Sequence, residues 1–165
     1  MKRLIVVFLC VVMLLASACN EMTTMQRLSE TLGINAKECQ ILSNTDSHGG
    51  FFGDGLEYVV AQCNSSVAAE IAKSIEWRKL PLSESLVAAI YGVKYENAVI
   101  GPYVNMNGVP CFPKVENGYY FFLDRQSEDE NSKDETSFLN RPSFNLTFAI
   151  YDTDNNTLYY CEYDT

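Results

Sequence analysis

Two runs of residues decide the fold of this chain: Phe144-Asn-Leu-Thr-Phe-Ala-Ile-Tyr151 and Thr157-Leu-Tyr-Tyr-Cys-Glu-Tyr163. In the first run, every second side chain from Phe144 to Ile150 is large and apolar, which is the period of a strand with one face in a core. The segment between the runs, Asp152-Thr-Asp-Asn-Asn156, consists of residues that favour tight turns. The sequence therefore predicts an antiparallel hairpin.

Three segments upstream of the hairpin predict further strands. Residues 118–124 form a short apolar run that is typical of a buried strand. Residues 55–63 are rich in β-branched and aromatic side chains, and residues 36–44 predict a first strand. We therefore expect an antiparallel sheet of about five strands that ends in a C-terminal β-meander.

Apolar residues at helical spacing predict three helices. The first covers residues 25–32 and is capped by Thr23 or Thr24. The second is capped by Ser65 or Ser66 and ends near Lys79. The third covers residues 84–91, with Ser83 as its cap and Gly92 as its end. Residues 93–117 are rich in proline, glycine and asparagine and predict irregular chain with one edge strand near residues 109–115. Together these patterns predict a single α+β domain over residues 25–165, with two to three helices packed on the sheet.

The start of the chain has the layout of an export signal. Lys2 and Arg3 precede an apolar run, residues 4–15, and the small residues Ala16-Ser17-Ala18 lead to Cys19. The run is shorter than the roughly 20 apolar residues that a membrane-spanning helix needs.

The segment Ala16-Ser17-Ala18-Cys19 resembles the lipobox of bacterial lipoprotein precursors. This resemblance implies a signal peptide over residues 1–18, lipid such as palmitate on Cys19, and a tether over residues 19–24. It also implies an exported protein that is anchored to the cell membrane and faces outside the cytoplasm.

The chain is acidic, with a formal net charge of -9 at pH 7. A surface of this sign repels nucleic-acid phosphates and anionic lipid headgroups. We therefore expect no nucleic-acid partner, and contact with the membrane through the N-terminal lipid only.

Export also bears on the cysteines. Cys10 lies in the signal, and a lipid on Cys19 leaves an even number for an oxidising compartment: Cys39, Cys63, Cys111 and Cys161. These four allow three disulfide pairings, between which the sequence does not choose, and buried free thiols are the alternative. Because none of them forms a Cys-x-x-Cys pair, the sequence predicts no zinc site and no other cofactor.

The glycine-rich loop Asp46-Ser-His-Gly-Gly-Phe-Phe-Gly-Asp-Gly55 contains the candidate site residues. His48 is the single histidine of the chain, and with Asp46 and Asp54 it could hold a metal ion or move a proton. Phe51 and Phe52 make the loop a candidate for recognition of a ligand. The simpler alternative is a hairpin connection whose glycines adopt positive φ angles, with a structural His48.

A charged insertion, residues 125–135, predicts a solvated loop between two strands. The glycine-rich loop and the segment Ile75-Glu-Trp-Arg-Lys-Leu-Pro81 resemble small lipoproteins of Gram-positive bacteria, a resemblance that implies no activity.

We expect a membrane-anchored domain that binds a protein or a ligand without doing chemistry. The alternatives are a hydrolase or metal-dependent enzyme centred on His48, Asp46 and Asp54, and a self-protection or inhibitor protein. A fully covered sheet with no exposed aromatic patch would count heavily against binding. A His48 ring in a cleft, within hydrogen-bond reach of Asp46 or Asp54, would favour an enzyme.

Overall fold

The computed structural model describes residues 22–49, 53–94, 96, 98–127 and 132–165. The predicted signal peptide, Cys19 and the loop residues Phe51 and Phe52 lie outside the described residues. No helix in the described ranges is long and apolar enough to cross a membrane.

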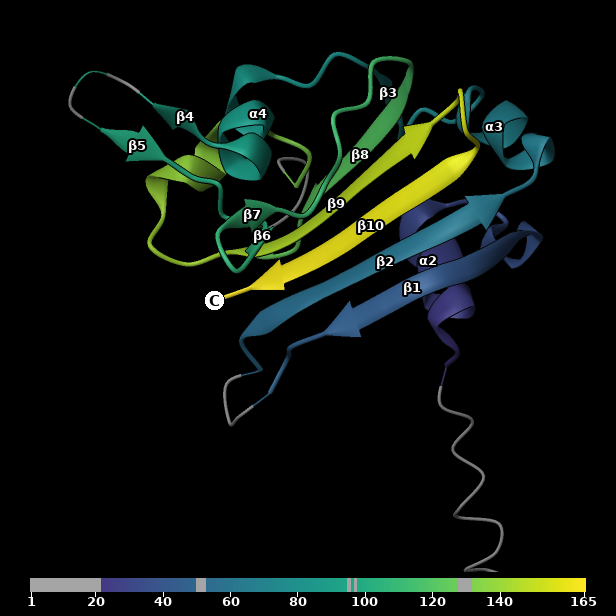
Figure 1. Ribbon diagram of the computed structural model, residues 1–165, viewed down its shortest axis with the longest axis horizontal. Helices are drawn as coiled ribbons and strands as arrows, with labels where there is room; N and C mark the ends of the chain where they lie inside the picture. Colours follow the sequence, from purple (N-terminus) through teal and green to yellow (C-terminus); the bar gives the residue numbers. More distant parts are fainter. Residues whose placement is uncertain (1–21, 50–52, 95, 97, 128–131) are drawn as a thin grey trace, which may run out of the picture.

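The described residues form an α+β domain around a six-stranded antiparallel sheet (Figure 1). Its strands are β1 (Cys39–Asp46), β2 (Gly55–Cys63), β3 (Arg78–Lys79), β8 (Gly118–Asp124), β9 (Asn145–Asp152) and β10 (Thr157–Asp164). Their order in the sheet is β1-β2-β10-β9-β8-β3. The predicted fold class is therefore confirmed, and so is the C-terminal meander, because β8, β9 and β10 pair in chain order.

The predicted hairpin lies in the middle of this sheet. β9 and β10 pair over their full length, with Phe148 opposite Cys161 and Leu158 opposite Tyr151. Both faces of β9 are buried, since Ala149 and Tyr151 are as inaccessible as Phe148 and Ile150. The alternating side chains of β9 therefore point into two buried layers, one on each face of the sheet, and neither face of this strand is open to solvent.

The first layer covers one face of the sheet with α2 (Thr24–Leu32), a 3-10 turn (Ala36–Glu38) and α3 (Ser65–Ile71). The second layer covers the other face with α4 (Glu84–Tyr91), a 3-10 turn (Ser137–Asn140) and the second of two short ribbons, while the first ribbon projects away from the sheet (Figure 1). The ribbons are β4 (Val93–Lys94) with β5 (Val99–Ile100), and β6 (Asn105–Met106) with β7 (Val109–Pro110). Figure 1 shows α2 behind the sheet and α4 in front of it.

Local capping explains α2 and α4. Thr23 caps α2 in a capping box with Gln26, and Gly33 ends the helix in the left-handed conformation. Ser83 caps α4 through a bond from Leu86 N, and the helix ends before Gly92. Both helices agree with the sequence prediction.

The prediction for α3 was wrong at both ends. Asn64, and neither Ser65 nor Ser66, caps the helix, and the helix ends at Ile71 instead of near Lys79. The chain turns there because Trp77 enters the first layer, where its indole Nε1–H donates to the Leu32 carbonyl at 3.0 Å. A longer helix would not deliver this side chain to the core.

Two strand predictions also need correction. β1 begins at Cys39 and continues to Asp46, because the 3-10 turn occupies residues 36–38. Residues 93–117 hold two ribbons in place of one edge strand over residues 109–115.

The charged insertion is packed against the domain in its described part. Glu135 is buried and pairs with Arg78, and Lys133 pairs with Glu76. Arg141 forms an ion pair with Asp124, Nη2 to Oδ2 at 2.8 Å, at the point where the insertion returns to the sheet. The prediction of a solvated loop is therefore wrong for Glu135, whose partner lies on β3, and residues 128–131 of the insertion lie outside the described residues.

One disulfide joins Cys39 to Cys63 across the β1–β2 pair, and Cys111 and Cys161 are free thiols. Burial raises the pKa of Cys111 to about 11 and raises that of Cys161 well above its ordinary value. Both thiols therefore stay protonated near neutral pH.

Candidate functional site

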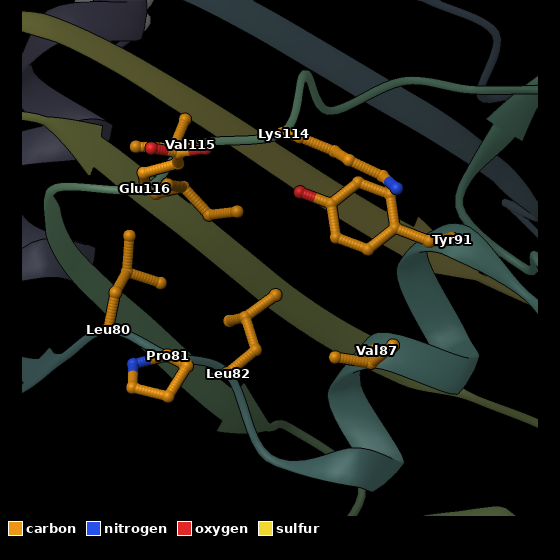
Figure 2. Close-up of a pocket in the computed structure, with 9 residues that line it drawn as sticks. Leu80, Pro81, Leu82, Val87, Tyr91, Lys114, Val115 and Glu116 are labelled. Atoms are coloured by element: carbon orange, nitrogen blue, oxygen red, sulfur yellow. The ribbon is translucent and has the colours of Figure 1, made fainter.

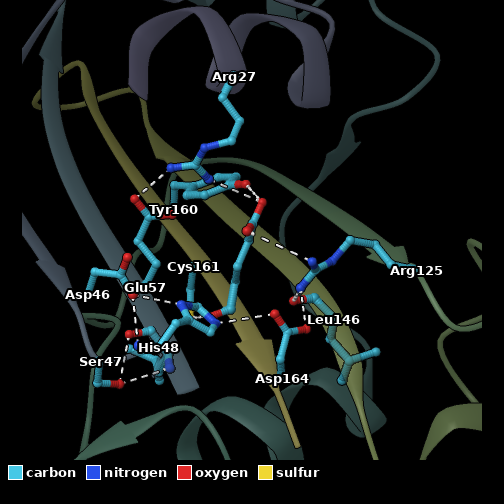
Figure 3. A network of polar contacts seen from close by, with 12 residues as sticks. Arg27, Asp46, Ser47, His48, Glu57, Arg125, Leu146, Tyr160, Cys161 and Asp164 are labelled. Atoms are coloured by element: carbon cyan, nitrogen blue, oxygen red, sulfur yellow. Dashed lines mark hydrogen bonds and ion pairs between the residues drawn. The ribbon is translucent and has the colours of Figure 1, made fainter. Parts of the chain in front are cut away.

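The loop that follows β1 places His48 between two carboxylates (Figure 3). His48 Nδ1 lies 2.7 Å from Asp46 Oδ1, and Nε2 lies 3.2 Å from Asp164 Oδ2 on β10. The backbone N–H of His48 also donates to Asp46 Oδ1 at 2.9 Å. This last bond lowers the pKa of Asp46, and the nearby imidazole adds to the effect.

Gly55 makes room for this arrangement. A Cβ on Gly55 would lie 2.5 Å from the Cα of His48, a separation that real structures do not tolerate. Gly55 also lies directly opposite Asp164 in the β2–β10 pair. The glycine therefore lets the backbone of His48 cross close enough to β10 for the ring to reach Asp164.

Gly55→Ala is expected to lower the free energy of unfolding by about 1–3 kcal/mol, because the added methyl group collides with backbone that cannot move alone. Chemical denaturation measures this loss. Gly49→Ala is the matched control, since its Cβ would meet nothing closer than 4.0 Å. Equal stability of the two variants would contradict the steric role of Gly55.

A chain of ion pairs continues from Asp164 across the first-layer face of the sheet (Figure 3). Asp164 Oδ1 binds Arg125 Nη2 at 2.6 Å, and Arg125 Nη1 lies 3.8 Å from Glu162 Oε2. Glu162 Oε1 lies 3.3 Å from Arg27 Nη1, and Arg27 Nη2 binds Glu57 Oε1 at 2.6 Å. These contacts join α2, β2, β10, the segment after β8 and the loop after β1.

Arg27 joins the last two carboxylates of this series, those of Glu162 and Glu57. Partial burial opposes the charge of its guanidinium, but the bond to Glu57, the charge of Glu57 and the charge of Glu162 outweigh that cost and raise its pKa. Its Cζ lies 6.0 Å from the centre of the Tyr160 ring, whose hydroxyl donates to Glu162. Burial first, and this bond second, raise the pKa of Tyr160, so the phenol stays neutral.

This series of ion pairs holds the loop after β1 against β10. Contact between His48 and Asp46 meets one condition of the enzyme hypothesis, but the second ring nitrogen faces Asp164 and is not open to a substrate. The Ser47 hydroxyl is bonded to the backbone of Leu56, and Asp54 is exposed. Among the described residues, no three His, Cys, Asp or Glu side chains are grouped so as to hold a metal ion.

A groove of about 490 Å³ opens on the opposite side of the sheet (Figure 2). Its aliphatic walls are Leu80, Pro81, Leu82, Val87, Val115 and Ile150. Tyr91, Lys114 and Glu116 complete the lining. Ile150 is buried in β9, so the groove reaches down to the sheet.

Helix α4 and the segment before β8 hold the groove open. Val87 and Tyr91 are one helical turn apart and face the same side of α4. The Tyr91 hydroxyl donates to the Pro113 carbonyl at 2.7 Å, and Leu80 N donates to the Gly118 carbonyl at 3.1 Å. Burial raises the pKa of Tyr91 to about 12, which keeps this donor protonated.

The sequence did not predict the groove, and it placed the candidate recognition surfaces on aromatic residues of the sheet and on Phe51 and Phe52, which lie outside the described residues. Both faces of the central strands are covered, whereas β1 at the edge is largely exposed. The large apolar side chains that are exposed in the described part of the chain are aliphatic: Met22, Leu42, Ile75, Val99 and Val109. By the criterion derived from the sequence, the lack of an exposed aromatic patch among the described residues weighs against the binding hypothesis, so that hypothesis now depends on a different surface, the groove. The signal for the groove was the apolar run Leu80-Pro-Leu82 together with Val87 and Tyr91, which are the large apolar residues of α4 that the core does not fully bury.

No protein-family model matches this chain. No curated protein and no solved structure matches it either. A function for this chain therefore rests on the geometry of its own residues.

Proposed function

We propose that this protein is an exported lipoprotein, held at the outer face of the cell membrane by lipid on Cys19, whose domain binds a small ligand without transforming it. The observation that carries the proposal is the groove of about 490 Å³ with its aliphatic walls. Ligand sites are commonly concave, mostly apolar and about 300–1,000 Å³ in volume. The ligand therefore has an apolar body.

Two features support the location. Residues 1–19 have the order of charged, apolar and small residues that export signals have. The disulfide between Cys39 and Cys63 is of a kind that persists in oxidising compartments.

Binding has more support than catalysis. An enzyme centred on His48 needs one ring nitrogen free for a substrate or a metal, and both nitrogens lie within 3.2 Å of a carboxylate oxygen. The groove is lined mainly by aliphatic side chains, with Lys114 and Glu116 as its charged groups, and its one side-chain hydroxyl, on Tyr91, is already bonded to the Pro113 carbonyl. In this proposal, the series of ion pairs around His48 has a structural role and holds the loop after β1 in place.

The test uses the full chain in membranes and a decanol that carries a photoreactive diazirine in its alkyl chain. After illumination and digestion, mass spectrometry compares the labelling of residues 80–93 with that of the rest of the domain. We expect these residues to be labelled in the wild type. Val87→Glu places a carboxylate in the groove and is expected to abolish this labelling.

Val99→Glu is the matched control, because Val99 is an exposed valine on β5 that does not line the groove. It is expected to be labelled like the wild type. Labelling of residues 80–93 that is no stronger than elsewhere, or that is unchanged in Val87→Glu, would overturn the proposal.

A further inference from the structure

We propose that the ligand is a free amphiphile with one alkyl chain and a carboxylate head, and that Lys114 selects it by binding the head. This inference rests on the proposed function and goes beyond it, since it names the chemistry at both ends of the ligand.

The shape of the site favours an alkyl chain. A second pocket, of about 360 Å³, lies beside the groove and shares Leu82 and Val87 with it. Val93 extends the apolar lining there. The two hollows, together called the trough, therefore adjoin at Leu82 and Val87 beside α4, and a flexible methylene chain that follows these residues can occupy both.

The small number of hydrogen-bonding side chains between the charged residues of the lining disfavours a peptide. An extended peptide brings backbone N–H and C=O groups, each of which costs free energy when it is buried without a partner. In the lining side chains, the polar groups are the charged ends of Lys114, Glu116 and Glu84 and the Tyr91 hydroxyl, which already donates to Pro113. An alkyl chain has no such groups to satisfy.

Lys114 supplies the charge that selects the head. The arginine and lysine residues that form ion pairs in the described part of the chain are Arg27, Arg78, Arg125, Lys133 and Arg141. Lys114 makes no ion pair with another described residue, and it lines the trough. In a chain with a net charge of -9, an ammonium without a carboxylate partner at the rim of an apolar site is suited to an anion.

The acidic residues of the trough orient the ligand. Figure 2 shows Lys114 beside Tyr91, with Glu116 on the side of Leu80 and Val115. Glu84 lines the second pocket. A carboxylate is repelled from both glutamates, so the head lies at Lys114 and the alkyl chain runs into the trough.

The experiment compares three photoreactive probes that share one decyl chain and end in a carboxylate, a hydroxyl or a trimethylammonium group. Each is added to membranes that carry the full chain, and labelling of residues 80–93 is quantified by mass spectrometry. In the wild type we expect the decanoate probe to label about fivefold more strongly than the decanol probe. The trimethylammonium probe is expected to label least.

Lys114→Gln is expected to bring decanoate labelling down to the level of decanol. Lys73→Gln is the matched control, because Lys73 is an exposed lysine that follows α3 in the first layer. It is expected to keep the preference for decanoate.

Equal labelling by decanoate and decanol, or a preference that survives in Lys114→Gln, would overturn the carboxylate inference and leave the proposed function standing. A preference for the trimethylammonium probe would also overturn it. Absence of labelling by all three probes would overturn the proposed function itself.

Discussion

Replacement of Phe148 by alanine is expected to lower the free energy of unfolding by about 3–5 kcal/mol. Phe148 is 1% exposed and lies on β9, between β8 and β10. Its ring lies 5.5 Å from that of Phe122, which in turn packs on Phe138 from the insertion. The cavity left by the smaller side chain would be enclosed by the sheet and the second layer, so it could not collapse fully.

Denaturation by urea, followed by fluorescence, measures this loss. Trp77 is the only tryptophan of the chain and lies in the first layer, so it reports whether damage in the second layer unfolds the whole domain. Ile75→Ala is the control, because Ile75 is 93% exposed and its truncation is expected to stay within about 0.5 kcal/mol. A loss below about 1 kcal/mol in Phe148→Ala would contradict the assignment of Phe148 to a closed core.

Loss of the disulfide is expected to have the second-largest effect. Serine at both Cys39 and Cys63 is expected to lower the free energy of unfolding by about 3 kcal/mol. The bond joins residues 24 positions apart, so its main contribution is to restrict the unfolded chain. Its removal leaves the β1–β2 pairing in place, and the folded sheet is expected to persist.

The same denaturation experiment tests this expectation. Cys111→Ser is the control, since Cys111 is a half-buried free thiol whose loss removes no cross-link. Addition of a reductant is expected to destabilise the wild type by a similar amount and the double serine variant not at all. Reductant that left the wild type unchanged would show that the bond contributes no stability.

Elements stabilised by near neighbours followed from the sequence. The hairpin of β9 and β10 combines strand alternation with an Asx turn, in which Asp152 accepts bonds from the backbone of Asp154 and Asn155. Helix α4 has its cap, Ser83, and its stop, Gly92, within the segment itself. Such interactions involve residues only a few positions apart, so the local pattern contains them.

Elements stabilised by distant partners did not follow from the sequence. Helix α3 ends where it does because Trp77 packs with α2, and the insertion is ordered by Arg78 and Asp124, which precede it on other strands. The pairing of Cys39 with Cys63 depends on the register of β1 and β2. Without that register, the sequence does not distinguish between the three possible disulfide pairings of the four cysteines.

The same division holds for the candidate sites. The contact of His48 with Asp46 is local and follows from the loop sequence, whereas its contact with Asp164 needs β10 beside β2. The groove needs three segments that are far apart in the chain: residues 80–82, α4 and residues 114–116.

The sequence by itself thus determined the fold class, the central hairpin, the helices with strong caps and the acidic character, because each arises from composition or from short-range periodicity. Only the tertiary structure decided which face of each strand meets which layer, which cysteines pair, and that an apolar trough with Lys114 at its rim exists. The physical reason is that burial and charge pairing act between residues that are close in space, and packing alone brings those residues together.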